Sequence, residues 1–221
     1  MFQTRKSFMV ESFQPVSAWV SAQALQVYTD FTTDLMGPEL AECWIDWVAM
    51  MFQNPDNQSK KSWCVYGEAG IGKMYLVEII EQMMGDSASC NTNSLDISNN
   101  VRVAYNPSLV LVDTSLIDPH CISTDYQLIS NTYSNYTNTN IVVMNALPPP
   151  LHPRDWIFAQ CAYQNGTTGI DYTRFFGNTA TGSSSEKGHL RGLYQALLKR
   201  NITVSKTTRI IEKMRCSLFW A

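Results

Sequence analysis

The sequence has 221 residues, of which 45% are hydrophobic and 16% charged, a composition that supports one α/β domain with a helical appendage or two small domains. Its net charge of −3 excludes a basic surface over the whole chain, although a few basic loop residues would still suffice to contact nucleic acid. No apolar run reaches the ~18 residues of a membrane span, and cysteines without zinc-ligand spacing indicate reduced thiols in an intracellular protein.

Two helices are predicted at the start of the chain. Apolar residues recur at helical spacing over residues 14–36 and again over residues 39–53, and Gly37-Pro38 separates the two runs. A turn at residues 54–57 ends the second helix. We therefore predict an N-terminal helical segment over residues 1–57.

The rest of the chain alternates helices with short apolar strands. Residues 62–66 read as a buried strand, and residues 73–84 read as a helix with Gly85 as its C-cap. The other predicted elements are strands at 101–105, 109–112, 141–144 and 156–162, polar loops at 131–140 and 177–185, and helices at 188–199 and from 207 onward. Such strands imply an α/β fold whose mostly parallel sheet has helices on both faces. We predict an α/β core at 58–165 and a C-terminal helical segment at 166–221.

The strongest motif lies between the first strand and the helix that follows it. It reads Gly67-Glu68-Ala69-Gly70-Ile71-Gly72-Lys73 and fits G-x-x-x-x-G-K, the first seven positions of the Walker A pattern. Glycines let the backbone curl so that N–H groups face phosphates, the helix N-terminus adds partial positive charge, and Lys73 would reach the β- and γ-phosphates. The alternative is a glycine-rich turn that binds nothing. We predict a nucleotide-binding P-loop in which Gly67 to Met74 surround the phosphates.

The position after Lys73 departs from this pattern. A Ser or Thr hydroxyl normally coordinates Mg²⁺ there, but this sequence has Met74, which carries no oxygen. Magnesium would have to rely on phosphate oxygens, water and a carboxylate. Metal-assisted phosphoryl transfer is therefore in question.

Two strand ends supply the remaining polar candidates. The strand at 109–112 closes in Asp113, a Walker B shape that predicts a carboxylate in the Mg²⁺ shell, but Thr114 occupies the position of the usual catalytic acid. The strand at 141–144 closes in Asn145, which suits a sensor that positions the lytic water. The alternatives are a turn cap for Asp113 and an ordinary strand-end amide for Asn145.

Further motifs lie on both sides of the loop. Cys-Trp-Ile-Asp-Trp-Val-Ala at 43–49 and Gln-Asn-Pro at 53–55 precede it, Leu-Val-Glu at 76–78 follows it, and a Gly- and Leu-rich helix pattern spans 188–202. This arrangement resembles superfamily 3 helicases, and above all the poxvirus-type and phage primase-helicase ATPase modules. Those carry a "dWla…iQnP" helix before the loop, an "F-V-E" helix after it and a closing "G…L…LL…dl" helix.

The resemblance implies an AAA+-like P-loop NTPase that binds ATP and Mg²⁺ and forms a hexameric ring of identical subunits, with no membrane partner. Such a ring hydrolyses ATP to move along single-stranded DNA (or RNA) during replication, in the cytoplasm or nucleus of an infected host. The catalytic residues would be Lys73, Asp113, Asn145 and Arg154, the last as an arginine finger toward a neighbouring subunit or, alternatively, as an ordinary surface arginine.

Three functions stay open at this point. The first is the helicase motor. The second is a catalytically degenerate module that binds nucleotide for assembly without turnover, because Met74 and Thr114 replace two groups that an active enzyme needs. The third is a small NTPase of another class that does not respond to DNA.

Overall fold

The computed structural model describes residues 15–54, 62–84, 89–93, 109–113, 140–145, 156–162, 172–176 and 184–202. The helices are α1 (Ala18–Met36), α2 (Pro38–Gln53), α3 (Lys73–Met84), α6 (Tyr172–Phe176) and α7 (Ser184–Lys199). The strands are β1 (Ser62–Tyr66), β2 (Ser89–Asn93), β3 (Leu109–Asp113), β4 (Asn140–Asn145) and β5 (Trp156–Gln160). This mixture of helices and a small parallel sheet agrees with the predicted α/β class. Over the described ranges, none of the helices has both the length and the hydropathy that a bilayer crossing requires.

The two N-terminal helices form where the apolar spacing predicts them. α1 begins at Ala18, later than expected, because the hydroxyl of Ser17 accepts a hydrogen bond from the Val20 amide (3.3 Å) and caps the helix. Gly37 ends α1 with a φ of +79°, which glycine adopts without strain. Pro38 then starts α2 at a position where its missing N–H costs nothing.

The five strands form one parallel sheet in the order β2-β3-β4-β1-β5. Strand β1 pairs with β4 on one side and with the edge strand β5 on the other, so that Tyr66 at its end is level with Asn145 and Gln160. The edge strand β2 was not predicted, because its sequence Ser-Cys-Asn-Thr-Asn is polar. The predicted strand at 101–105 and the predicted helix from 207 onward lie outside the described residues.

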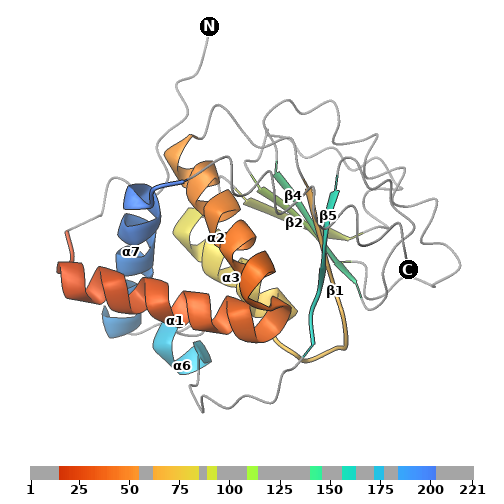
Figure 1. Cartoon of the computed structure of the whole chain (residues 1–221), viewed down its shortest axis with the longest axis horizontal. Helices are drawn as coiled ribbons and strands as arrows, with labels where there is room; N and C mark the ends of the chain where they lie inside the picture. The colour runs from red at the N-terminus through yellow and green to blue at the C-terminus, as the bar shows by residue number, and fades with distance from the viewer. Residues whose placement is uncertain are drawn as a thin grey trace, which may run out of the picture.

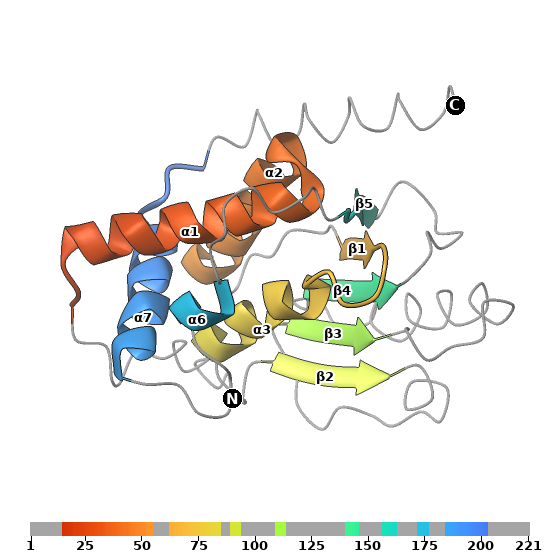
Figure 2. The same ribbon diagram turned by 90° about the horizontal axis from the view of Figure 1, so that it is seen from below.

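One face of the sheet packs against the helices. Alternate strand residues join the helices in a single hydrophobic cluster: Trp63, Val65, Leu109, Leu111, Val142, Met144, Ile157 and Ala159. Both views place the described helices on the same side of the strands (Figures 1 and 2). The residues that alternate with them along the strands point to the opposite face of the sheet. Three of these are also fully buried: Cys64, Val110 and Val112. Side chains on both faces of the sheet are therefore buried, and the helices of the described residues pack on one of these faces.

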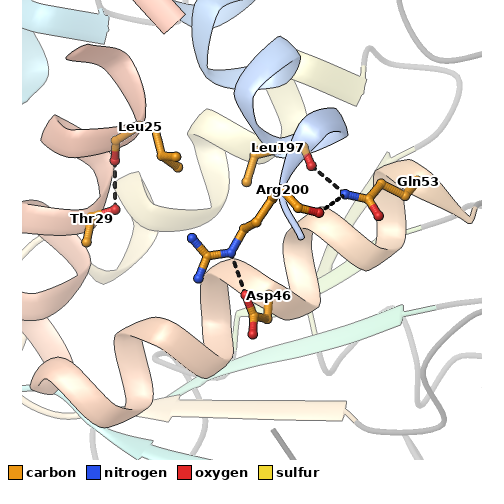
Figure 3. A network of polar contacts seen from close by, with 6 residues as sticks. All are labelled: Leu25, Thr29, Asp46, Gln53, Leu197 and Arg200. Atoms are coloured by element: carbon orange, nitrogen blue, oxygen red, sulfur yellow. Dashed lines mark hydrogen bonds and ion pairs between the residues drawn. The ribbon is translucent and has the colours of Figure 1, made fainter. Parts of the chain in front are cut away.

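α2 and α7 are joined by polar contacts at the end of α7 (Figure 3). The side-chain amide of Gln53 donates to the carbonyl oxygens of Leu197 and Arg200, both at 2.8 Å. The Arg200 guanidinium pairs with Asp46 at 2.5 Å. Asp46 and Gln53 belong to the sequence motifs before the loop, and Arg200 belongs to the closing motif. Residues that carried the helicase resemblance in separate parts of the chain therefore meet in the fold.

Candidate functional site

The loop at residues 67–72 connects the buried strand β1 to helix α3. Its backbone takes positive φ at Gly67 (+144°), Gly70 (+81°) and Gly72 (+97°). Residues with a Cβ rarely adopt these angles, so the three glycines are what allows the chain to curl here. The curled connection from a buried strand to a helix, on which the P-loop prediction depends, is present.

The Lys73 side chain folds back over this loop. Its ammonium donates to the carbonyl oxygen of Gly67 at 2.7 Å and also to that of Glu68. The loop tip, formed by Glu68, Ala69 and Gly70, is exposed to solvent. The Lys73 ammonium thus lies beside the main chain of a glycine-rich turn whose tip is exposed.

The start of the loop lies against the end of β5. A Cβ at Gly67 would be 2.2 Å from the carbonyl oxygen of Cys161, so only glycine fits. The Cys161 amide in turn donates to the Tyr66 carbonyl at 2.7 Å. Burial raises the pKa of the Cys161 thiol to about 12, although the charge of Lys73 acts to lower it. This contact was not predicted, because it joins segments far apart in the sequence.

The end of the loop lies against α1. A Cβ at Gly72 would meet the Phe31 ring at 3.5 Å, and that ring packs against Tyr75 and Tyr172 with centroid distances of 5.7 and 4.9 Å. The Tyr75 hydroxyl donates to the Tyr172 carbonyl oxygen at 2.9 Å. The Tyr172 hydroxyl donates to Asp34 at 2.6 Å. We call Phe31, Asp34, Tyr75 and Tyr172 the aromatic brace; sequence reasoning missed it because helix α6, which carries Tyr172, was not predicted.

Met74 directs its side chain into packing rather than toward a ligand. It is partly buried and lies against the hydrophobic core, as do its neighbours Ile71 and Tyr75. No group of three or more His, Cys, Asp or Glu side chains among the described residues could hold a metal ion. The side chain that follows Lys73 therefore contributes packing at the start of α3 and no oxygen atom to the loop.

The other predicted site residues lie at strand ends or outside the described part. Asp113 and Asn145 are the last residues of β3 and β4, and the strand register puts Asn145 level with Tyr66, next to the loop. In parallel sheets, ligands bind at this carboxyl edge. The fold thus brings the backbones of both residues to the edge that carries the loop. Their side chains, and the residues Thr114 and Arg154, lie outside the described part of the structure.

Comparisons with known proteins add a likeness of fold. No model of a known protein family matches the chain, and no curated protein matches it. Solved structures of the NrS-1 C-terminal region do: two apo structures each match at 14% identity over 91% of this chain, with TM-scores of 0.55 and 0.56. A third matches at 15% identity over 85% of the chain, with a TM-score of 0.54. The chain covers only 50–55% of those chains, so it spans about half their length and shares an α/β fold with them.

Proposed function

We propose that the chain is the ATP-binding module of a superfamily 3-like replicative helicase and that residues 67–73 bind the phosphates of ATP. The observation that carries this proposal is the curled glycine loop between β1 and α3, with the Lys73 ammonium held over it and its tip open to solvent. The motifs on both sides of the loop and the fold likeness over 91% of the chain support it.

Lys73 would act by exchanging its partners. In the structure its ammonium binds two neutral carbonyl oxygens, those of Gly67 and Glu68. A phosphate oxygen at the loop would replace them with hydrogen bonds between opposite charges, which are stronger than those from an ammonium to a neutral carbonyl. The N-terminus of α3 adds partial positive charge at the same place. Asp113 and Asn145 would complete the site from the neighbouring strand ends, as a ligand of the Mg²⁺ shell and as a sensor of the attacking water.

A second candidate function is favoured by the packing of Met74. Its thioether lies against the core at the position of the Mg²⁺-binding hydroxyl, and Thr114 stands at the position of the catalytic acid. A module of this kind would bind nucleotide to organise an assembly without turning it over. The hexameric ring, the single-stranded DNA partner and the arginine finger at Arg154 follow from the family resemblance and belong to the first candidate.

The decisive experiment measures ATP binding and ATP turnover, with and without single-stranded DNA, for the parent, Lys73→Ala and Lys199→Ala. Lys199 is an exposed lysine on α7 and serves as the matched control. Loss of the Lys73 ammonium should weaken ATP binding by about 10- to 100-fold, as expected for charge-assisted hydrogen bonds, whereas Lys199→Ala should bind like the parent.

The same data separate the two candidates. A helicase motor turns ATP over faster when single-stranded DNA is present. A degenerate module binds ATP with negligible turnover, and Met74→Thr combined with Thr114→Glu should restore some of it. Absence of ATP binding by the parent, or binding that Lys73→Ala leaves unchanged, would overturn the proposal.

A further inference from the structure

We infer that the aromatic brace positions the loop for phosphate, which makes Tyr75, Tyr172 and Asp34 positioning residues of the nucleotide site. This inference rests on the proposed function. It deepens that proposal because it assigns a role in nucleotide binding to α1 and α6, two helices outside the Walker motifs.

The first step is the contact between α1 and the end of the loop. Gly72 is the residue directly before Lys73, and the buried Phe31 ring lies beside it, 3.5 Å from the position that a Cβ at Gly72 would take. The Gly72 carbonyl also accepts the first hydrogen bond of α3, from the Leu76 amide at 3.3 Å. Phe31 therefore packs against the point at which the loop becomes a helix, next to the residue that carries the ammonium.

The second step is a closed circuit of contacts around that point. Tyr75, in the first turn of α3, packs its ring on Phe31 and donates its hydroxyl to the main chain of Tyr172. Tyr172 donates its own hydroxyl to Asp34, which lies one turn beyond Phe31 on α1. The start of α3 thus contacts α1 in two ways. Tyr75 packs directly on Phe31 of α1, and it is also linked to Asp34 of α1 through Tyr172 of α6. Hydrogen bonds to a carboxylate are stronger than those between neutral groups, so the Asp34 end is a firm anchor.

The third step is that α6 is itself fixed to α7. The Phe175 and His189 rings stack at 3.9 Å with an interplanar angle of 6°, and His189 Nδ1 lies 2.8 Å from the Phe175 carbonyl oxygen. A brace anchored at both ends holds the loop in its curled form before any ligand arrives. Pre-ordering of this kind raises affinity, because the ligand does not have to order the loop on binding.

The test uses variants that remove single polar contacts and keep the packing. Tyr75→Phe keeps the ring and removes the hydroxyl that binds Tyr172. Asp34→Ala removes the anchor, whereas Asp34→Asn keeps an acceptor oxygen in the same place. Tyr194→Phe is the matched control, because Tyr194 is a buried tyrosine of the same core that packs on Phe52, on the α2 and α7 side.

Three quantities are measured for each variant: the Kd of ATP, the free energy of unfolding, and amide hydrogen exchange at residues 67–73 without ligand. Tyr75→Phe and Asp34→Ala should raise the Kd of ATP by about 3- to 10-fold, the size expected for one hydrogen bond, and should speed exchange in the loop. Asp34→Asn, which keeps a neutral acceptor, should lie between the parent and Asp34→Ala in both respects. Tyr194→Phe should leave the Kd and the loop exchange unchanged even if it lowers stability.

The outcomes separate this inference from the proposed function. If the parent binds ATP but Tyr75→Phe and Asp34→Ala bind it equally well, the brace has no positioning role. The same follows if the Kd rises only in proportion to lost stability and Tyr194→Phe raises it too. If the parent binds no ATP, the proposed function fails. The hydrogen-exchange data then test whether the aromatic brace orders the loop. Unchanged exchange at residues 67–73 in Tyr75→Phe would show that it does not.

Discussion

The Cα of Gly67 lies so close to the end of β5 that a Cβ there would be 2.2 Å from the Cys161 carbonyl oxygen. The neighbouring Gly70 also has positive φ, but a Cβ there meets nothing within 4 Å. Gly67→Ala should therefore cost about 2–3 kcal/mol of stability and disturb the loop, whereas Gly70→Ala should cost about 1–2 kcal/mol from backbone strain alone. Urea unfolding and ATP titration of both variants check this; equal losses would mean that β5 does not limit the loop.

Single residues of the loop were predictable because the Walker pattern is local. Seven consecutive positions, a strand before them and a helix after them suffice to place Gly67 to Lys73 on a curled turn. The surroundings were not predictable in the same way, since Cys161 and Phe31 reach the loop only through the tertiary fold. The roles assigned to Asp113, Asn145 and Arg154 stay predictions. The described structure places the backbones of Asp113 and Asn145 at the sheet edge but not their side chains, and Arg154 lies outside the described residues.

At the scale of elements, the ion pair between Asp46 of α2 and Arg200 at the end of α7 can be tested by mutation. The Asp46 side chain is only 8% exposed and its partner Arg200 is 22% exposed, so Arg200→Met leaves a buried carboxylate without this ion pair. We expect a loss of about 2–3 kcal/mol, somewhat below that for a fully buried pair. Lys199→Met, at an exposed lysine next in the chain, should change stability by less than about 0.5 kcal/mol.

A double-mutant cycle tells whether the ion pair itself is responsible. Adding Asp46→Asn to Arg200→Met should recover part of the loss, because the second change removes the buried charge that Arg200 balanced. Urea unfolding gives all the free energies. Strict additivity of the two changes would show that Asp46 and Arg200 do not interact, contrary to the 2.5 Å contact.

Helices and strands were predictable where the apolar pattern is strong. They were not predictable where contacts with distant parts of the chain determine the secondary structure. The spacing in α1, α2 and α3 and the apolar runs of β1, β3, β4 and β5 gave elements close to those observed. β2 has a polar sequence, and it forms a strand because its backbone pairs in parallel with β3. α6 has five residues, too few for a periodic pattern, and α7 begins at Ser184, ahead of the predicted start, within a stretch expected to be a loop.

At the scale of the whole molecule, one hydrophobic cluster runs through all three predicted segments. It includes Tyr28 and Trp44 from the first, Trp63 from the second and Leu193 from the third. The Trp44 indole donates to the Tyr28 hydroxyl at 2.8 Å and packs edge-on against Trp63 at 4.9 Å. The described residues therefore share a core, which favours cooperative unfolding. The segment boundaries at 57 and 165 stay predictions.

Because the core contains buried thiols, we expect the free energy of unfolding to change with pH in the alkaline range. Cys43, Cys64 and Cys161 are buried and form no disulfide in the described structure. Burial, with the nearby Asp46, Glu42 and Glu39 charges, raises the pKa of Cys43 from 9.0 to about 11. Burial likewise raises the pKa of Cys161 from 9.0 to about 12. Both groups thus hold their protons more tightly in the folded chain than in the unfolded one.

Because the unfolded thiols ionise near pH 9 and the folded ones do not, the unfolded state binds fewer protons above that pH. The free energy of unfolding should therefore be independent of these thiols below pH 8 and fall between pH 9 and 11, by about 1.4 kcal/mol per pH unit for each thiol. Urea unfolding at a series of pH values measures the slope. Replacing Cys43 and Cys161 by Ala should make the fall between pH 9 and 11 shallower and leave the slope below pH 8 as it was. An identical alkaline slope in this variant would mean that neither thiol is shielded from water in the folded protein.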